Sequence, residues 1–125
     1  MADKEKGCED DDALSISLVR RERTVRVEKP DAERTEVEYT LREMTAMERD
    51  QWLQRFQKRM KRGTTIIQDF VGIEADLVAA CLYDERDVRV PLELIKEWPA
   101  SQQRRLAIAC RRLNLLDAEE DDAKN

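Results

Sequence analysis

The sequence predicts an α+β fold, mostly α, in which an N-terminal β-hairpin is followed by a compact bundle of about four helices. Apolar residues alternate with polar ones between residues 23 and 41, which indicates strands. A helix-capping pattern follows at residues 45–48, and apolar residues beyond it recur with helical spacing. The length of 125 residues is typical of one domain with a single modest core.

The two predicted strands lie on either side of a turn. Val25 and Val27 alternate with polar residues, and so do Val37, Tyr39 and Leu41. The intervening "EKPDAER" contains Pro and Asp, which favour a turn, so an antiparallel hairpin is expected. Because an isolated hairpin is only marginally stable, its apolar face should pack on helices.

The first helix is predicted over residues 46–62. In "TAME", Thr45 and Glu48 have the spacing of a capping box, and Gly63 supplies a stop. Its apolar face is predicted to consist of Trp52, Leu53, Phe56 and Met60.

Three more helices are predicted after Gly63. One should cover residues 73–83, with an apolar face formed by Ile73, Leu77, Ala80 and Cys81. Pro91 suits the first turn of a short helix, and Pro99 begins the last helix, which should run to about Leu115 or Leu116.

Charge is concentrated at the two ends of the chain. There are 23 Lys and Arg against 28 Asp and Glu, and residues 1–12 and 117–125 each carry a net charge of −4, which leaves +3 between them. Neither end has apolar periodicity, so 1–13 and 117–125 are predicted to be disordered acidic tails around a single domain at 14–116. No apolar run has the length of a membrane span, and we expect a cytosolic protein without a membrane partner.

The residue types present argue against catalysis and metal binding. The chain has no histidine, which excludes a histidine base, and three glycines provide no phosphate-binding loop. Three cysteines without a CxxC pair predict no zinc site, and Cys81 and Cys110 are expected to be reduced core residues. We therefore expect no enzymatic activity, catalytic residue, metal or cofactor.

The last predicted helix has two apolar stripes. Leu106, Ala109, Cys110 and Leu113 form the stripe expected to face the core. The opposite stripe and its rim of arginines are the candidate partner-binding residues: Arg104, Arg105, Ile108, Arg111, Arg112 and Leu115. An apolar centre with an arginine rim is typical of a protein interface. The alternative is that Ile108 packs against a neighbouring helix.

A second basic cluster keeps nucleic-acid binding open as an alternative function. It consists of Arg55, Lys58, Arg59, Lys61 and Arg62, which together with the arginines of the last helix could neutralise phosphates. The charge of only +3 between the acidic ends argues against this alternative, because duplex-binding domains usually carry a clear basic excess.

Residues 24–116 resemble the tail assembly chaperones of long-tailed bacteriophages. The resemblance is carried by "VEYTLREMTAMERDQWL" and by "GIEADLVAACLYDERDVRVPLELIKEWPASQQRRLAIACRRLN". Many members have a glycine after the closing Asn, whereas Leu115 follows Asn114 in this chain. From this resemblance we expect both a fold and a function for the chain.

The resemblance implies a non-enzymatic protein that acts in the host cytoplasm during tail morphogenesis and is absent from the mature virion. Such chaperones bind the tape-measure protein and recruit tail-tube subunits around it, so these two proteins are the expected partners, and self-association is compatible with the arginine-rimmed stripe. Two alternatives remain open: a small nucleic-acid-binding or regulatory protein, and a structural connector or completion protein of the tail.

Overall fold

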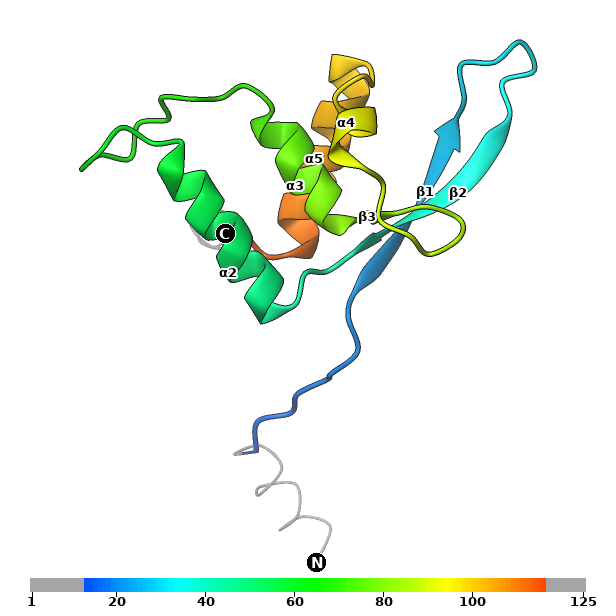
Figure 1. Cartoon of the computed structure of the whole chain (residues 1–125). Coiled ribbons are helices and arrows are strands. Elements are labelled where there is room, and N and C mark those ends of the chain that lie inside the picture. Colours follow the sequence, from blue (N-terminus) through cyan, green and yellow to red (C-terminus); the bar gives the residue numbers. More distant parts are fainter. Residues whose placement is uncertain (1–12, 117–125) are drawn as a thin grey trace, which may run out of the picture.

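The computed structural model describes residues 13–116, in which a small antiparallel sheet packs against helices (Figure 1). The elements in chain order are β1 (Glu22–Glu28), β2 (Glu36–Arg42), α2 (Ala46–Lys58), α3 (Ile73–Cys81), β3 (Leu82–Tyr83), α4 (Leu92–Ile95) and α5 (Ala100–Leu113). This arrangement confirms the predicted α+β, mostly α, fold with its N-terminal hairpin. The predicted acidic tails lie outside the described residues except for residue 13, and the domain limits stay a prediction.

The hairpin forms as the alternation predicts. β1 pairs with β2 in an antiparallel register that places Val25 opposite Tyr39 and Val27 opposite Val37. These residues share the face that packs on the helices, and Tyr39 is buried there. On the other face Arg26 lies opposite Glu38, as expected.

A third strand, β3, completes the sheet and was not predicted. The helix expected over residues 73–83 ends at Cys81, and the next two residues are extended. Leu82 pairs with Leu41 and Tyr83 with Thr40, so β2 lies in the centre of the sheet with the order β1-β2-β3. The predicted helix ends early because β2 has an open edge. Leu82 and Tyr83 form hydrogen bonds with the backbone groups at this edge, which stabilises the extended conformation over two more helical residues.

Helix α2 begins as predicted and ends earlier than predicted. Thr45 and Glu48 form the complete capping box. The helix was expected to reach Arg62, but it ends at Lys58 because the following residues form a hairpin-like loop. In this loop Met60 pairs with Ile67, and the carbonyl of Arg59 accepts the N–H of Gln68 at 2.7 Å.

The apolar face of α2 is narrower than the sequence predicts. Trp52 is buried and stacks on Phe56 with 5.1 Å between the ring centroids. Leu53 is 36% exposed, and Met60 lies beyond the end of the helix. The core therefore contacts α2 along one edge that begins at Trp52.

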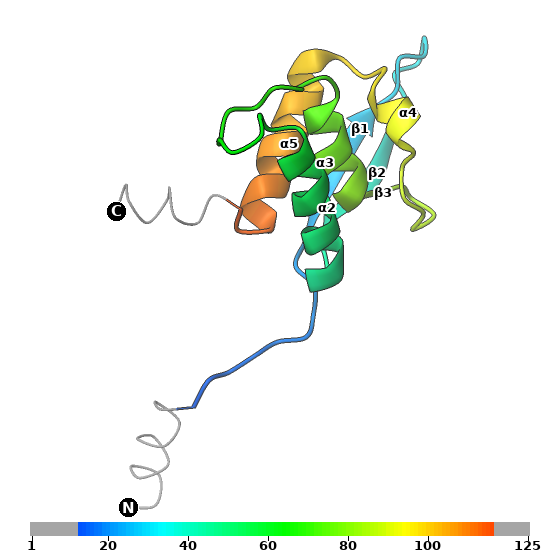
Figure 2. The ribbon, with the colours of Figure 1, turned by 60° about the vertical axis from the view of Figure 1, so that its left-hand side comes forward.

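Helix α3 forms the centre of the molecule, between α2 and α5 (Figure 2). Leu77, Ala80 and Cys81 are buried as predicted, and Ala75 and Val78 are buried as well. Because its neighbours α2, α4 and α5 cover several of its sides, α3 has no single apolar stripe.

The last two helices begin at prolines. Pro91 precedes α4 and Pro99 precedes α5, in agreement with the prediction. On α5, Ala107 and Cys110 are buried, and the remaining residues of the predicted core stripe pack partly buried against the core. No helix among residues 13–116 is long and apolar enough to cross a lipid bilayer.

The side chain of Asn114, at the end of α5, connects three parts of the core. Its Oδ1 accepts the backbone N–H of Met44 at 2.8 Å. Its Nδ2 donates to the carbonyl oxygen of Cys110 at 2.8 Å and to Sγ of Cys81 at 3.4 Å. One amide therefore joins the β2–α2 junction to α3 and α5.

The two described cysteines are free and buried, which confirms the prediction of reduced core residues. Cys81 lies at the end of α3 and Cys110 on the facing side of α5. A hydrogen bond with Cys81, together with burial, raises the pKa of the Cys110 thiol well above its ordinary value. Cys110 is therefore protonated at neutral pH and unsuited to act as a nucleophile.

Candidate functional site

The outer face of α5, defined by Arg104, Arg105, Ile108, Arg111 and Arg112, is the candidate interface. The four arginines are exposed, and Ile108 is half-buried between them. Leu106 and Ala109 are partly buried and pack against the core. Ile108 is not among the described apolar residues that do so. The helix therefore turns an apolar residue away from the core, within an arginine rim.

Two arginines of the rim, Arg104 and Arg105, make weak surface contacts within the molecule. Arg104 lies 3.8 Å from Glu74 of α3 while remaining 71% exposed, and Arg105 donates to the side-chain oxygen of Gln102 at 3.2 Å. Surface pairs of this kind are worth at most about 1 kcal/mol and rearrange easily. The long arginine stems can therefore cover apolar surface of a partner while the charged ends stay in water.

Leu115, the sixth predicted contact residue, does not lie on the helix. Helix α5 ends at Leu113, and Leu115 is 60% exposed with a positive φ of 57°. Its N–H donates to the carbonyl of Arg112 at 3.2 Å, and the N–H of Leu116 donates to that of Arg111 at 2.9 Å. This is a Schellman motif with Leu115 at the position that glycine usually occupies, so the helical projection of Leu115 does not apply.

Leu115→Gly is expected to raise the free energy of unfolding by about 1 kcal/mol. A left-handed conformation costs a residue with a Cβ about 1–2 kcal/mol, and the greater freedom of glycine in the unfolded chain offsets part of the gain. Urea denaturation measures the change. Leu115→Ala removes the same exposed side chain but keeps the positive φ, so it should give no gain. Equal stability of the two variants would contradict this explanation.

The basic cluster near the end of α2 is partly used within the molecule. Arg55 donates to both carboxylate oxygens of Asp76 at 3.2 Å. Arg59 donates to the carbonyl of Val71 at 2.8 Å and lies 3.8 Å from the carboxylate of Asp69. These contacts hold the loop after α2 against the start of α3. They reduce the positive charge that the cluster can offer to phosphates.

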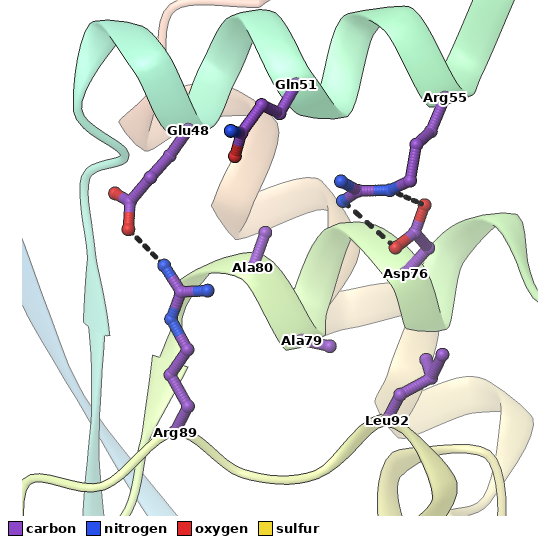
Figure 3. A pocket seen from close by; sticks show the side chains of 8 residues that line it. All are labelled: Glu48, Gln51, Arg55, Asp76, Ala79, Ala80, Arg89 and Leu92. Carbon is purple, nitrogen blue, oxygen red and sulfur yellow. Dashed lines mark hydrogen bonds and ion pairs between the residues drawn. The ribbon is translucent and has the colours of Figure 1, made fainter.

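A pocket of about 160 Å³ lies between α2, α3 and the segment before α4 (Figure 3). Its lining residues are Glu48, Gln51, Arg55, Asp76, Ala79, Ala80, Arg89 and Leu92. Two ion pairs bound it, Glu48 with Arg89 and Arg55 with Asp76, and the alanines of α3 lie between them. Each charged side chain is paired with an opposite charge. The two ion pairs therefore connect α2 to α3 and to the segment before α4, and they leave no unpaired charge among these described lining residues to bind an ion.

Glu48 has several partners at the start of α2. Its carboxylate accepts the N–H of Thr45 at 2.8 Å and binds Arg20 at 3.0 Å as well as Arg89. Burial alone would raise the pKa of Glu48, but the Thr45 hydrogen bond and the two arginines together lower it below its ordinary value. Glu48 is therefore ionised at neutral pH and joins the N-terminal segment, α2 and the segment before α4.

Five of the six predicted contact residues thus lie on α5, and the sixth, Leu115, lies just beyond the end of the helix. The sequence analysis did not identify a third segment with strand-like alternation, "ALSISLV" at residues 13–19, in which apolar residues stand at 14, 16 and 18. The capping box identified Glu48 as a cap, but its two arginine partners come from distant segments, and no local pattern could indicate them.

Comparisons with known proteins give one match. No protein-family profile matches the sequence, and no curated protein matches it. One solved structure, that of the tail assembly chaperone of bacteriophage HK97, aligns with 75% of this chain and 85% of its own, at 19% sequence identity and a TM-score of 0.48. That protein is of the same kind as the family that the sequence resembles.

Proposed function

We propose that this protein is a non-enzymatic tail assembly chaperone that binds a tape-measure protein and helps to recruit tail-tube subunits in the host cytoplasm. The sequence resemblance over residues 24–116 supports the family. The observation that carries the binding role is the outer face of α5, where Ile108 is half-buried, does not pack against the core, and is surrounded by four exposed arginines.

The chemistry of this face suits a long, largely apolar helical client. Ile108 provides the apolar contact, and the arginine stems around it extend the apolar area without burying the charged groups. The charged ends stay hydrated in the complex and bind carboxylates along the edge of a client helix. Such a contact keeps an aggregation-prone client in solution because it covers apolar surface with a charged exterior.

Co-expression with the tape-measure protein is expected to increase the soluble fraction of that client, and Ile108→Asp is expected to abolish the increase. A carboxylate at this position would be buried unpaired in the complex, whereas in the free protein it can reach water. Soluble client is measured after centrifugation, and the melting temperature of the variant is measured in parallel.

Leu94→Asp is the matched control, because Leu94 is a 48% exposed apolar residue on a different helix, α4. It should leave the solubilised fraction unchanged. Unchanged client solubility with the native chaperone would refute the proposed function. A large loss of melting temperature in Ile108→Asp would instead make Ile108 a structural residue, and finding the polypeptide in purified virions would favour a structural tail component.

A further inference from the structure

A short arm, residues 13–19, precedes β1 and leads away from the sheet and the helices (Figures 1 and 2). Four of its side chains are large and apolar, and they are 85%, 73%, 92% and 80% exposed: Leu14, Ile16, Leu18 and Val19. Serines separate the first three, so an extended backbone places these three on one face. The arm therefore has the pattern of a β-strand that has no sheet.

The sheet has an open edge at β1. The strand order β1-β2-β3 leaves one side of β1 without a partner strand among the described residues, whereas β3 is bridged on its outer side through Tyr83 and Arg89. Val25 and Val27 on β1 are only half-buried, although the equivalent face of β2 is buried at Tyr39 and Leu41. An added strand with apolar residues at alternate positions would complete the cover of this face.

The arm cannot reach the edge of its own β1. Only Arg20 and Arg21 separate the arm from β1, so pairing within one chain would need a two-residue turn with positive φ, which neither arginine has. Both are also held in place: Arg20 donates to the carbonyl of Glu43 at 2.7 Å, and the N–H of Arg21 donates to the Glu43 carboxylate at 3.0 Å.

We propose that two copies of this chain form a symmetric dimer in which the arm of each copy pairs as an antiparallel strand with β1 of the other. The uncharged run 13–19, between Asp12 and Arg20, and β1 both have seven residues, and full overlap sets the register. Leu14 then lies opposite Val27, and Ile16 lies opposite Val25, on the face that packs on the helices. Ser17 lies opposite Thr24 on the solvent face. A shift by one residue would instead place the apolar residues of the arm on the charged face.

A second copy fits the edge because one chain carries both halves of the contact. The exchange is reciprocal and closed, so no arm and no β1 edge remains free. The arm carries no charged residue, so it meets the alternating charges of β1 without repulsion. Two such strand contacts bury an area of the order of the roughly 1,600 Å² that stable interfaces use.

The mass of the full chain in solution, measured by light scattering after size exclusion at micromolar concentration, is expected to be that of a dimer. Ile16→Asp should weaken the dimer by roughly a hundredfold, because its carboxylate would be buried between apolar side chains. The melting temperature of the resulting monomer should match that of the native monomer on dilution, since Ile16 is 73% exposed within one chain.

Ser17→Asp is the matched control, since it places the same charge one residue further along the arm, on the solvent face. It should remain dimeric. A monomeric native chain, a dimer that tolerates Ile16→Asp, or equal loss in both variants would overturn the proposal.

The register has a separate test, in a Cys8→Ser background. Ser17→Cys combined with Thr24→Cys should give a covalent dimer on oxidation, because opposite residues of antiparallel strands have Cβ atoms about 5 Å apart. Ser17→Cys combined with Glu28→Cys should not, and cross-linking of both pairs to the same extent would refute the register. The outcome does not depend on the client, so this proposal and the proposed function can fail separately.

Discussion

Leu41→Ala is expected to lower the free energy of unfolding by about 2–5 kcal/mol, the cost of removing a buried leucine and leaving a cavity. Leu41 is 0% exposed and lies on β2, the central strand, between Arg23 of β1 and Leu82 of β3. The flanking strands restrict how far the backbone can move to fill the space. Urea denaturation followed by far-UV circular dichroism measures the loss.

Leu53→Ala is the control for Leu41→Ala. Leu53 belongs to the apolar face that the sequence predicts for the first helix, but it is 36% exposed in the structure. Its truncation should cost less than about 1 kcal/mol, because the site borders solvent and leaves no closed cavity. Equal losses in the two variants would contradict the observed position of the core.

Asn114→Ala is expected to lower the free energy of unfolding by about 2–3 kcal/mol. It removes the acceptor of the Met44 N–H and the donor to the Cys110 carbonyl, and a buried polar group left without a partner costs about 1–3 kcal/mol. Met44 is only 6% exposed, so water reaches its N–H poorly. The loss is measured by urea denaturation at neutral pH.

Gln103→Ala provides a matched comparison for the Asn114 variant. Gln103 donates one hydrogen bond, at 3.2 Å, to the carbonyl of Ile95, so its loss should cost only about 1 kcal/mol. Asn114→Asp keeps the acceptor for Met44 but turns a carboxylate oxygen toward the Cys110 carbonyl, and it should be at least as destabilising as alanine. An Asn114→Ala variant no less stable than Gln103→Ala would show that the network contributes little.

Features that depend on a few neighbouring residues could be predicted from the sequence. The alternation of Val25 and Val27 identified β1, the Thr45 and Glu48 pair identified the start of α2, and Pro99 identified the start of α5. Each is governed by local backbone geometry or by a single capping contact, so its residues carry the information themselves.

Features that depend on distant partners could not be predicted. β3 has only two residues, and it is a strand because β2 offers it a free edge. Helix α2 ends at Lys58 because the chain folds back and the N–H of Gln68 donates to the carbonyl of Arg59. The periodicity of apolar residues along the helix carries no information about this contact. Asn114 connects positions separated by 70 residues, and its role follows only from the packed structure.

The candidate interface shows the same division. The helical projection predicts Ile108 on the outer face of α5, and in the structure Ile108 is half-buried on that helix. Projection failed for Leu115 because the helix ends two residues earlier in a Schellman motif. Leu115 has a positive φ, a conformation that glycine would adopt at this position with less strain.

The place of β3 in the sheet has a consequence for the order of folding. The hairpin of β1 and β2 consists of contacts close in sequence, whereas Leu82 pairs with Leu41 only after about forty intervening residues have been made. The hydrogen bond from the Met44 N–H to the Asn114 side chain can form only later still, once the end of α5 has been made. A chain that ended before α5 would therefore leave the apolar residues of α3 without the helix that covers them, and we expect such a fragment to aggregate.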